Sequence, residues 1–323
     1  MSKAYYNRQL PVNLIDAINK KYPWLVDFVI RHEELDFQTV SNASSSWFQV
    51  YRGTGRLFRI NSAGIISADP AYIARCPEFY ENPSPELLGL LLSKINNDVK
   101  FDRYYADPLL TMKREGYYQT LISRRYTFFT QPEDDFIVID KELVIGFSDK
   151  PAEEEWNRPI IEDLERCLVK ARAENNNTHL PQSIKTKYGE FDFLGLTWDG
   201  DIIIMELKED DPSATYKSPV QIGYYNRQFN KLLSELPNLY DGIKEMIQQK
   251  IDLKILSIPE GKKLPDKLSG NIRNYLIVGN DSSLSPEICR RFRMFREYFL
   301  PSMRAFTCDT NGSLVISNKL EQP

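Results

Sequence analysis

The chain has 323 residues, of which 42% are hydrophobic, and a formal net charge of −4 at pH 7. This length and composition suit two domains with sizeable cores, while the acidic balance argues against a dedicated basic duplex-binding domain. No apolar stretch approaches the ~18 residues of a membrane span, and the N-terminus leads into no signal-type apolar core. Four cysteines without paired spacing predict reduced thiols in a cytoplasmic protein rather than disulfides or zinc ligands.

The first half of the chain predicts an α+β domain of residues 1–150. In chain order, its patterns predict a helix over 14–19, paired strands over 48–51 and 56–60, a helix from Pro85 through Leu92, and strands over 126–129 and 136–139. A proline and a charge run over 150–155 predict the boundary to a second domain of residues 151–323. The first domain would recognise a substrate or a partner.

Two short segments of the first domain mix basic and aromatic side chains. They are Tyr51-Arg52 and Arg124-Arg125-Tyr126. Proteins that bind single-stranded nucleic acid combine these residue types, although such pairs are also common on ordinary surfaces.

Pro159 predicts the first turn of a helix over 160–169, because proline suits the start of a helix. Ile161, Leu164 and Leu168 fall on one apolar stripe of this helix. Glu165 lies at the edge of the stripe and Glu162 further round. A solvated helix face explains both glutamates equally well.

Two apolar runs, 191–196 and 202–208, predict adjacent strands joined by a tight turn. Strand pairing depends on the length of this turn, because opposed residues share a face of the sheet. A two-residue turn would oppose Asp192 to Leu207, whereas a three-residue loop ending at Gly200 opposes Asp192 to Glu206. Glycine suits the left-handed position of such a loop, so we predict an odd loop or a bulge.

The charged residues of this hairpin predict a metal site. Carboxylates in apolar strands are costly unless they are paired or bind a metal, and Mg²⁺ prefers oxygen ligands. Asp192 and Glu206 would supply carboxylates to Mg²⁺ or Mn²⁺, and Leu207 its backbone carbonyl. Lys208 shares a face with Glu206 and would orient an attacking water or offset charge on a phosphate. In the alternative, a structural interaction protein, the acids pair only with Lys208.

Ser218-Pro219 predicts the start of the next helix, with serine as N-cap and proline in the first turn. Gln221 and Tyr225 are four residues apart and would share the face nearest Lys208, where they would contact a phosphate or a nucleotide. The alternative is a solvent-facing glutamine and a half-buried tyrosine.

The rest of the chain predicts a strand over 274–278, a helix from Ser285-Pro286 and a last strand over 303–308. Alternating strands and helices predict an α/β fold with a mixed sheet covered on both faces. Further cations would contact phosphate or simply line solvated faces: Lys185, Lys187, Lys217, Arg290, Arg291, Arg293 and Arg296. A catalytic role for His179, in the loop before the hairpin, stays open.

The ordered set Gly189-Glu190-Phe191-Asp192 and Glu206-Leu207-Lys208 resembles the PD-(D/E)xK nuclease superfamily, with Phe191 in place of the motif's proline. The segment 221–225 is similar to the Q-x-x-x-Y element of its RecB-like branch. The resemblance covers about residues 155–310. It implies a restriction-endonuclease-like αβββαβ core and catalytic roles for Asp192, Glu206 and Lys208. It also implies that Glu165 or Glu162 reaches the waters around the metal.

From these features we expect a metal-dependent nuclease, an endonuclease or exonuclease, that hydrolyses phosphodiester bonds in DNA rather than RNA. The alternative is a non-catalytic nuclease-fold protein that acts as a nucleic-acid-binding or assembly module. A homodimer or a protein partner is compatible with both.

Overall fold

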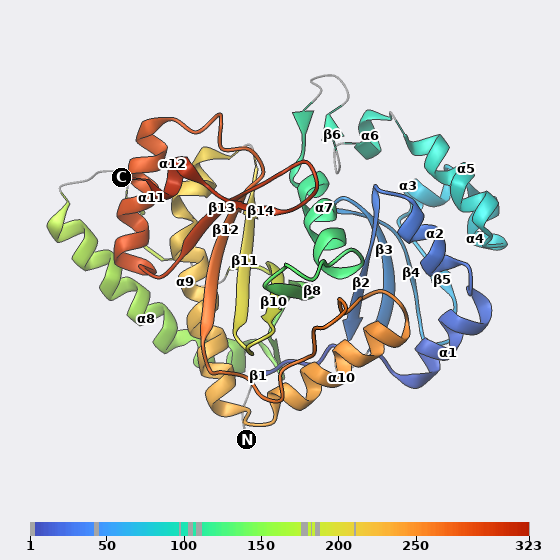
Figure 1. Cartoon of the computed structure of the whole chain (residues 1–323), viewed down its shortest axis with the longest axis horizontal. Coiled ribbons are helices and arrows are strands. Elements are labelled where there is room, and N and C mark those ends of the chain that lie inside the picture. The colour runs from blue at the N-terminus through green and yellow to red at the C-terminus, as the bar shows by residue number, and fades with distance from the viewer. Residues whose placement is uncertain are drawn as a thin grey trace. The chain divides into compact units, whose positions relative to one another are not determined.

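The computed structural model describes residues 4–41, 45–96, 98–102, 106–107, 112–175, 180–181, 183–184, 188–209 and 211–322. The chain forms two compact units (Figure 1). Unit 1 contains residues 1–6, 135–240 and 263–323, and unit 2 contains residues 7–134 and 241–262. The main change of unit therefore lies between Asp134 and Asp135 rather than at residue 150, and unit 2 also takes a segment from the second half of the chain.

Unit 1 is built around a six-stranded sheet with the strand order β14-β13-β12-β11-β10-β8. Its strands are β1 (Ala4–Tyr5), β8 (Phe136–Leu143), β9 (Gly146–Phe147), β10 (Phe191–Thr197), β11 (Ile202–Lys208), β12 (Ile272–Val278), β13 (Arg304–Cys308) and β14 (Leu314–Ile316). Its helices are α8 (Lys150–Glu174), α9 (Pro212–Glu235), α11 (Pro286–Phe299) and α12 (Asn318–Glu321). β1 and β9 form a separate antiparallel pair.

The sheet of unit 1 is mixed, which confirms the α/β class. β10 is antiparallel to both of its neighbours, β8 and β11, whereas β12 runs parallel to both β11 and β13. Among the described residues, β10 and β11 lie between α8 and α9 along the chain, and the third antiparallel strand, β8, precedes α8. In this part of the chain the strands and helices therefore follow the order β8-α8-β10-β11-α9, which differs from one helix followed by three strands. All residues of β11 from Ile202 to Leu207 are buried, so both faces of the central strand are covered.

Two predicted helix starts are wrong, because both prolines lie inside longer helices. α8 begins after the N-cap Asp149 and contains Pro159, and α9 begins after the N-cap Asp211 and contains Pro219. Each true start has an N-cap aspartate and a proline in the first turn, so proline in the first turn is common to the predicted and the true starts.

Unit 2 contains a four-stranded antiparallel sheet in the order β2-β3-β4-β5. Its strands are β2 (Leu35–Ser41), β3 (Ser46–Arg52), β4 (Gly55–Ile60), β5 (Ile66–Ser67), β6 (Ala106–Asp107) and β7 (Met112–Lys113). Its helices are α1 (Val12–Lys21), α2 (Leu25–Arg31), α3 (Pro70–Ile73), α4 (Pro77–Glu81), α5 (Pro85–Ile95), α6 (Val99–Asp102) and α7 (Glu115–Thr127). α10 (Leu239–Asp252) begins at the end of a unit 1 segment and continues in unit 2.

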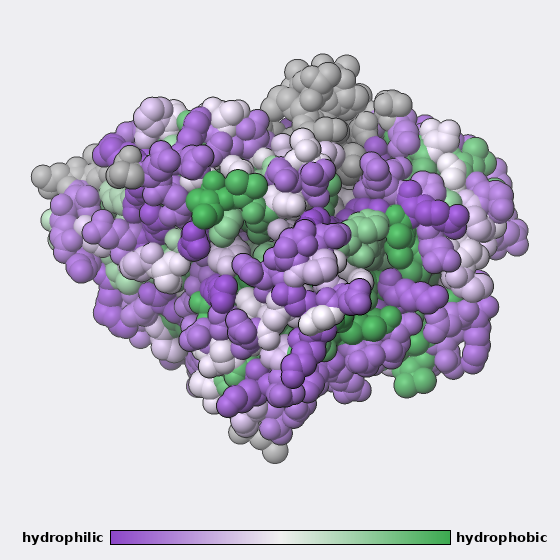
Figure 2. Space-filling model, viewed as in Figure 1, coloured by the Kyte–Doolittle hydropathy of each residue, from purple (hydrophilic) through white to green (hydrophobic). Residues whose placement is uncertain are grey.

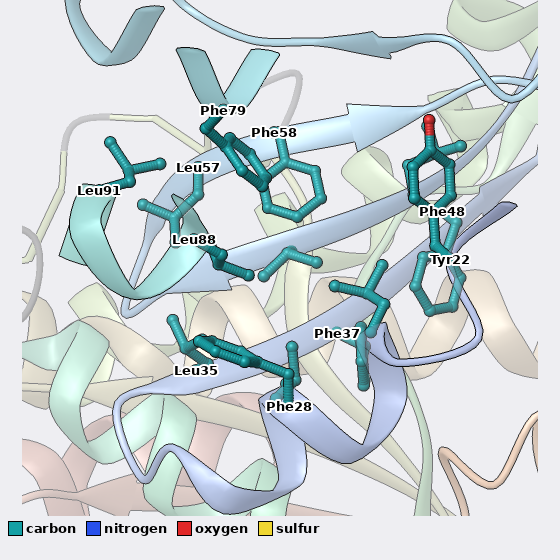
Figure 3. Packing of buried hydrophobic residues seen from close by; sticks show 14 of the residues in the cluster. Tyr22, Phe28, Leu35, Phe37, Phe48, Leu57, Phe58, Phe79, Leu88 and Leu91 are labelled. Carbon is teal, nitrogen blue, oxygen red and sulfur yellow. The ribbon is translucent and has the colours of Figure 1, made fainter. Parts of the chain in front are cut away.

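The core of unit 2 lies between its sheet and helices. Phe37, Phe48 and Phe58 of the strands share one buried cluster with Phe28 of α2 and Leu88 of α5 (Figure 3). The predicted early helix, hairpin, Pro85 helix and strand at 136–139 are confirmed. The strand predicted over 126–129 is wrong, because this segment forms the end of α7.

Two further features of the molecule are the state of its cysteines and the polarity of its surface. All four cysteines are free, and burial raises the pKa of the Cys308 thiol to about 12, which keeps it protonated. Within the described parts of the chain, no helix combines the length and the apolar character that a bilayer crossing needs. The face shown in Figure 2 is largely hydrophilic, with apolar residues in separate small patches.

Candidate active site

The hairpin that carries the predicted acids has the odd loop that strand parity requires. Leu196 pairs with Ile202, and the Thr197 N–H donates to the Asp201 carbonyl at 2.9 Å, which leaves three residues in the loop. Gly200 has a φ of +92°, in the left-handed region. The prediction of a three-residue loop is confirmed.

Asp192 lies one residue beyond the regular ladder, whose last recorded pair is Phe193 with Met205. Its Oδ2 accepts a hydrogen bond of 2.6 Å from the N–H of Leu207. The two predicted carboxylates therefore meet at the same end of the hairpin, with the Asp192 side chain bound to the residue next to Glu206.

Glu206 is 1% exposed, and two donors converge on its Oε1. One is the Lys208 ammonium, which forms an ion pair with the carboxylate, and the other is Gln221 Nε2 at 2.6 Å. Oε2 of Glu206 is buried too, and it accepts no hydrogen bond from the residues that the structure describes. A carboxylate removed from water depends on such charge-assisted bonds, because burial alone penalises its charge by several kcal/mol, in order of magnitude.

Gln221 and Tyr225 lie at the predicted place even though their helix begins earlier than predicted. Gln221 Nε2 also donates to the Tyr225 hydroxyl at 3.0 Å, and that hydroxyl donates to the Glu190 carbonyl at 2.9 Å. Burial, aided by the nearby Glu206 carboxylate, raises the pKa of Tyr225, so its hydroxyl keeps its proton. A chain of hydrogen bonds thus links the strand before Asp192 to Glu206.

Glu190 takes part in this chain through its backbone carbonyl, a role that the sequence analysis did not assign. Every residue carries a backbone carbonyl, so no residue-type signal marks this one. The aromatic ring of Tyr225 packs against Phe191 with ring centroids 5.2 Å apart, which holds the same strand end from a second direction.

Neither glutamate of α8 has a described contact with the hairpin acids. Glu165 Oε1 accepts a hydrogen bond of 2.6 Å from the Ile184 N–H, and Glu162 is exposed. Glu162 lines a pocket formed by β9 and the first half of α8, to which neither Asp192 nor Glu206 contributes.

All four arginines considered for phosphate contact bind other groups of the protein. Arg290 and Arg291 bind Glu287, Arg293 donates to the carbonyls of Lys319 and Gln322, and Arg296 pairs with Glu321. Lys217 donates to Ser213 at 2.9 Å. His179, Lys185 and Lys187 lie outside the described residues.

The donor set suits a cation that prefers oxygen ligands, such as Mg²⁺ or Mn²⁺. Within the described ranges, no group of three or more histidine, cysteine, aspartate or glutamate side chains is gathered for a metal. Mg²⁺ needs fewer protein ligands, since one or two carboxylates with waters and phosphate oxygens complete its shell. Asp192 and Glu206 match that requirement, and the Leu207 carbonyl would add a third oxygen.

Comparisons with family models, with curated proteins and with solved structures found no match to this chain.

Proposed function

We propose that this protein is a metal-dependent nuclease of the PD-(D/E)xK type, with a restriction-endonuclease-like core formed by the sheet of unit 1, α8 and α9. The observation that carries the proposal is the convergence of Asp192, Glu206, Lys208 and Gln221 at one end of the β10–β11 hairpin. These four residues come from three elements, and three of them are charged although they adjoin a buried strand.

In this proposal Asp192, Glu206 and the Leu207 carbonyl hold Mg²⁺ or Mn²⁺. A bound metal would lower the pKa of a water molecule and offset the negative charge that develops on the phosphate. Lys208 would donate a hydrogen bond to the attacking water or to a phosphate oxygen. Gln221 fixes the Glu206 carboxylate, and Tyr225 fixes the strand before Asp192.

The substrate class is nucleic acid, with DNA proposed ahead of RNA from the resemblance. The proposal also includes a cytoplasmic setting, in which free thiols such as these four cysteines stay reduced.

A structural cluster without catalysis is the second candidate. The ion pair between Lys208 and Glu206 favours it, because the ammonium compensates the charge of the buried carboxylate without any metal. The two candidates differ in metal binding, which the structural cluster does not need.

The decisive experiment is a calorimetric titration with Mn²⁺ beside a cleavage assay on labelled DNA in Mg²⁺. Asp192→Ala and Glu206→Gln should lose both metal binding and cleavage, because each removes a negative oxygen ligand. Glu206→Gln keeps the shape of the side chain and an oxygen that can accept from Gln221, so its fold should survive. Asp199→Ala is the matched control, since this exposed carboxylate lies in the loop at the other end of the same hairpin. Full Mg²⁺-dependent cleavage by Asp192→Ala or Glu206→Gln would refute the assignment.

A further inference from the structure

The four-stranded sheet of unit 2 has one apolar and one polar face. Along β3, Phe48 and Val50 enter the core, so Trp47, Gln49 and Tyr51 lie on the opposite face. Trp47 and Tyr51 are half-buried, and they are separated by about 13 Å along the strand at ~3.3 Å per residue. Gln49 between them is 4% exposed, so the two rings flank a buried polar residue and are themselves only partly accessible.

A β-bulge places two arginines of β4 on this same polar face. Arg59 pairs with Gln49 and Arg56 pairs with Tyr51, with a shift of register between the two pairs. Residues three apart in a regular strand point to opposite faces, so only the extra residue, Leu57, allows both arginines to share one face. Leu57 is fully buried in the core instead.

Arg59 forms a stacked pair with Trp47. Its guanidinium carbon lies 3.9 Å from the centroid of the indole ring, and its Nε donates to Ser67 Oγ at 3.1 Å. These two contacts fix the plane of the guanidinium. The pair presents a flat, positively charged surface, which suits the face of a nucleic-acid base.

Arg56 and Tyr51 meet at a second point on the same face. Both donate to Gln49 Oε1, Tyr51 at 3.0 Å and Arg56 at 3.4 Å. A guanidinium has five N–H donors, and the recorded side-chain contacts of Arg56 and Arg59 use one each. Among the described residues neither arginine forms a salt bridge, so their charge is not neutralised by a carboxylate at contact distance.

Of the two segments that the sequence suggested, Tyr51-Arg52 contributes only Tyr51 to this face, because Arg52 is 8% exposed. The arginines of the other segment bind groups within the protein. Arg124 donates to the carbonyls of Val29, Ile30 and Leu35, and Arg125 pairs with Asp134. These arginines stabilise the fold of unit 2, whereas Arg56 and Arg59 of the β3–β4 face keep N–H donors that the described side-chain contacts do not use.

We propose that the polar face of β3 and β4, formed by Trp47, Tyr51, Arg56 and Arg59, binds single-stranded nucleic acid. A base stacks on the outer side of the Arg59–Trp47 pair, and the remaining N–H donors of Arg56 and Arg59 contact phosphate oxygens. Stacking and phosphate contacts of this kind do not depend on sequence. The choice of nucleic acid as partner rests on the proposed nuclease function, whereas the surface itself belongs to unit 2 alone.

Fluorescence anisotropy with labelled 20-nucleotide dT and U strands, in a metal chelator that prevents cleavage, tests the proposal on the full chain. Arg59→Ala should weaken binding about 10-fold or more, because it removes a stacking surface and a phosphate contact. Its slope of log K against log salt should flatten by about 0.7, the value for one phosphate of a single strand. Arg59→Lys should fall between wild type and Arg59→Ala, since lysine keeps the charge without the plane.

Arg31→Ala is the matched control, because Arg31 is an exposed arginine of α2 in the same unit and its loss changes the net charge equally. Circular dichroism melting checks the fold of each variant, and Arg56→Gln serves if Arg59→Ala does not fold. Equal affinities for Arg31→Ala and the Arg59 or Arg56 variants overturn the proposal, as does a wild-type protein that binds neither strand. Preference for dT or U decides between DNA and RNA.

The two proposals fail in different ways. If wild type cleaves DNA while the Arg56 and Arg59 variants bind and cleave normally, the binding face is wrong and the nuclease function stands. If those variants lose binding while wild type shows no metal-dependent cleavage, the face is right and the nuclease function is wrong.

Discussion

Glu206 shows how a single buried carboxylate depends on its neighbours. Its donors are Lys208 from the same strand and Gln221 from α9, and both act on the same oxygen. Removing one partner of a buried ion pair leaves an uncompensated charge and typically destabilises by about 3–5 kcal/mol. Stability and catalysis therefore have to be measured separately for every variant of this cluster.

The role of Lys208 can be separated from that of the acids. In the proposed nuclease, Lys208→Ala should lower the cleavage rate by roughly 10²-fold or more, because a positioned charge next to the reacting phosphate is lost. Its Mn²⁺ affinity should change much less, since an ammonium is not a ligand. Single-turnover cleavage gives the rate and calorimetry gives the Mn²⁺ affinity, both measured below the melting temperature of the variant.

Lys217→Ala is the control for Lys208, because the contacts of this α9 lysine with described residues are to Ser213 and Tyr216, away from Glu206. An unchanged cleavage rate in Lys208→Ala would reduce the lysine to a charge partner of Glu206.

At the scale of single elements, the hairpin loop was predictable and the helix starts were not. An odd number of loop residues is needed to place Asp192 and Glu206 on the same face of the hairpin. Gly200 favours such a loop, so the local sequence decides the loop length. A proline does not decide in the same way where a helix begins. Ser218-Pro219 has the signature of a helix start and yet lies within α9. The helix continues because the Thr215 carbonyl, which loses its N–H donor to Pro219, accepts a hydrogen bond of 2.8 Å from Ser218 Oγ. This hydrogen bond depends on the rotamer of Ser218, which a sequence pattern does not predict.

Position 200 needs glycine for two reasons, its left-handed backbone conformation and the lack of space for a Cβ atom. A Cβ built on it would lie 2.6 Å from the backbone carbonyl oxygen of Lys267, whereas Gly270, with φ +89°, has nothing within 4 Å. Gly270→Ala should thus cost about 1–2 kcal/mol for the left-handed backbone alone. Gly200→Ala should cost clearly more, on the order of 3 kcal/mol, because a backbone atom has to move. Urea unfolding measures both, and equal losses would contradict the close approach to Lys267.

The serine that supports Pro219 gives a second test. Ser218→Ala should destabilise the protein by about 1–3 kcal/mol, because the buried Thr215 carbonyl loses its donor. Replacing Pro219 by alanine in the same variant returns a backbone N–H to that carbonyl and should recover the loss. Ser234→Ala is the control, since Ser234 donates to the Lys231 carbonyl in the same geometry but on the exposed side of α9. Its effect should stay within about 0.5 kcal/mol, and a comparable effect of Ser218→Ala would contradict this account.

At the scale of the whole molecule, the sequence predicted two parts but not how the chain divides between them. The proline and charge run after residue 149 reads as a linker, yet it is the first turn of α8. β8 lies before that run and pairs with β10, which comes about 50 residues later, so its membership is set by a long-range contact. Residues 241–262, the second segment of unit 2, could not be assigned to this unit from the local sequence either. Leu253 and Ile255 of this segment join the core of unit 2 although they lie far along the chain from its other residues.

This division predicts which fragments fold. A fragment of residues 135–323, with 241–262 replaced by a short Gly-Ser linker, keeps β8 and every other strand of the six-stranded sheet. The linker can be short because the Tyr240 hydroxyl donates to the Pro265 carbonyl at 2.6 Å, so the two cut ends lie close together. This fragment should unfold cooperatively in urea.

The same fragment started at residue 151 should not unfold cooperatively. It lacks β8, a strand buried along nearly its whole length, and it leaves the edge of β10 unpaired and apolar. We expect it to aggregate or to unfold without a cooperative transition, measured by circular dichroism and size-exclusion chromatography. If both fragments unfolded with the same midpoint and slope, β8 would not belong to the cooperative unit, and the boundary at residue 150 would describe the folding of the chain better than the one after Asp134.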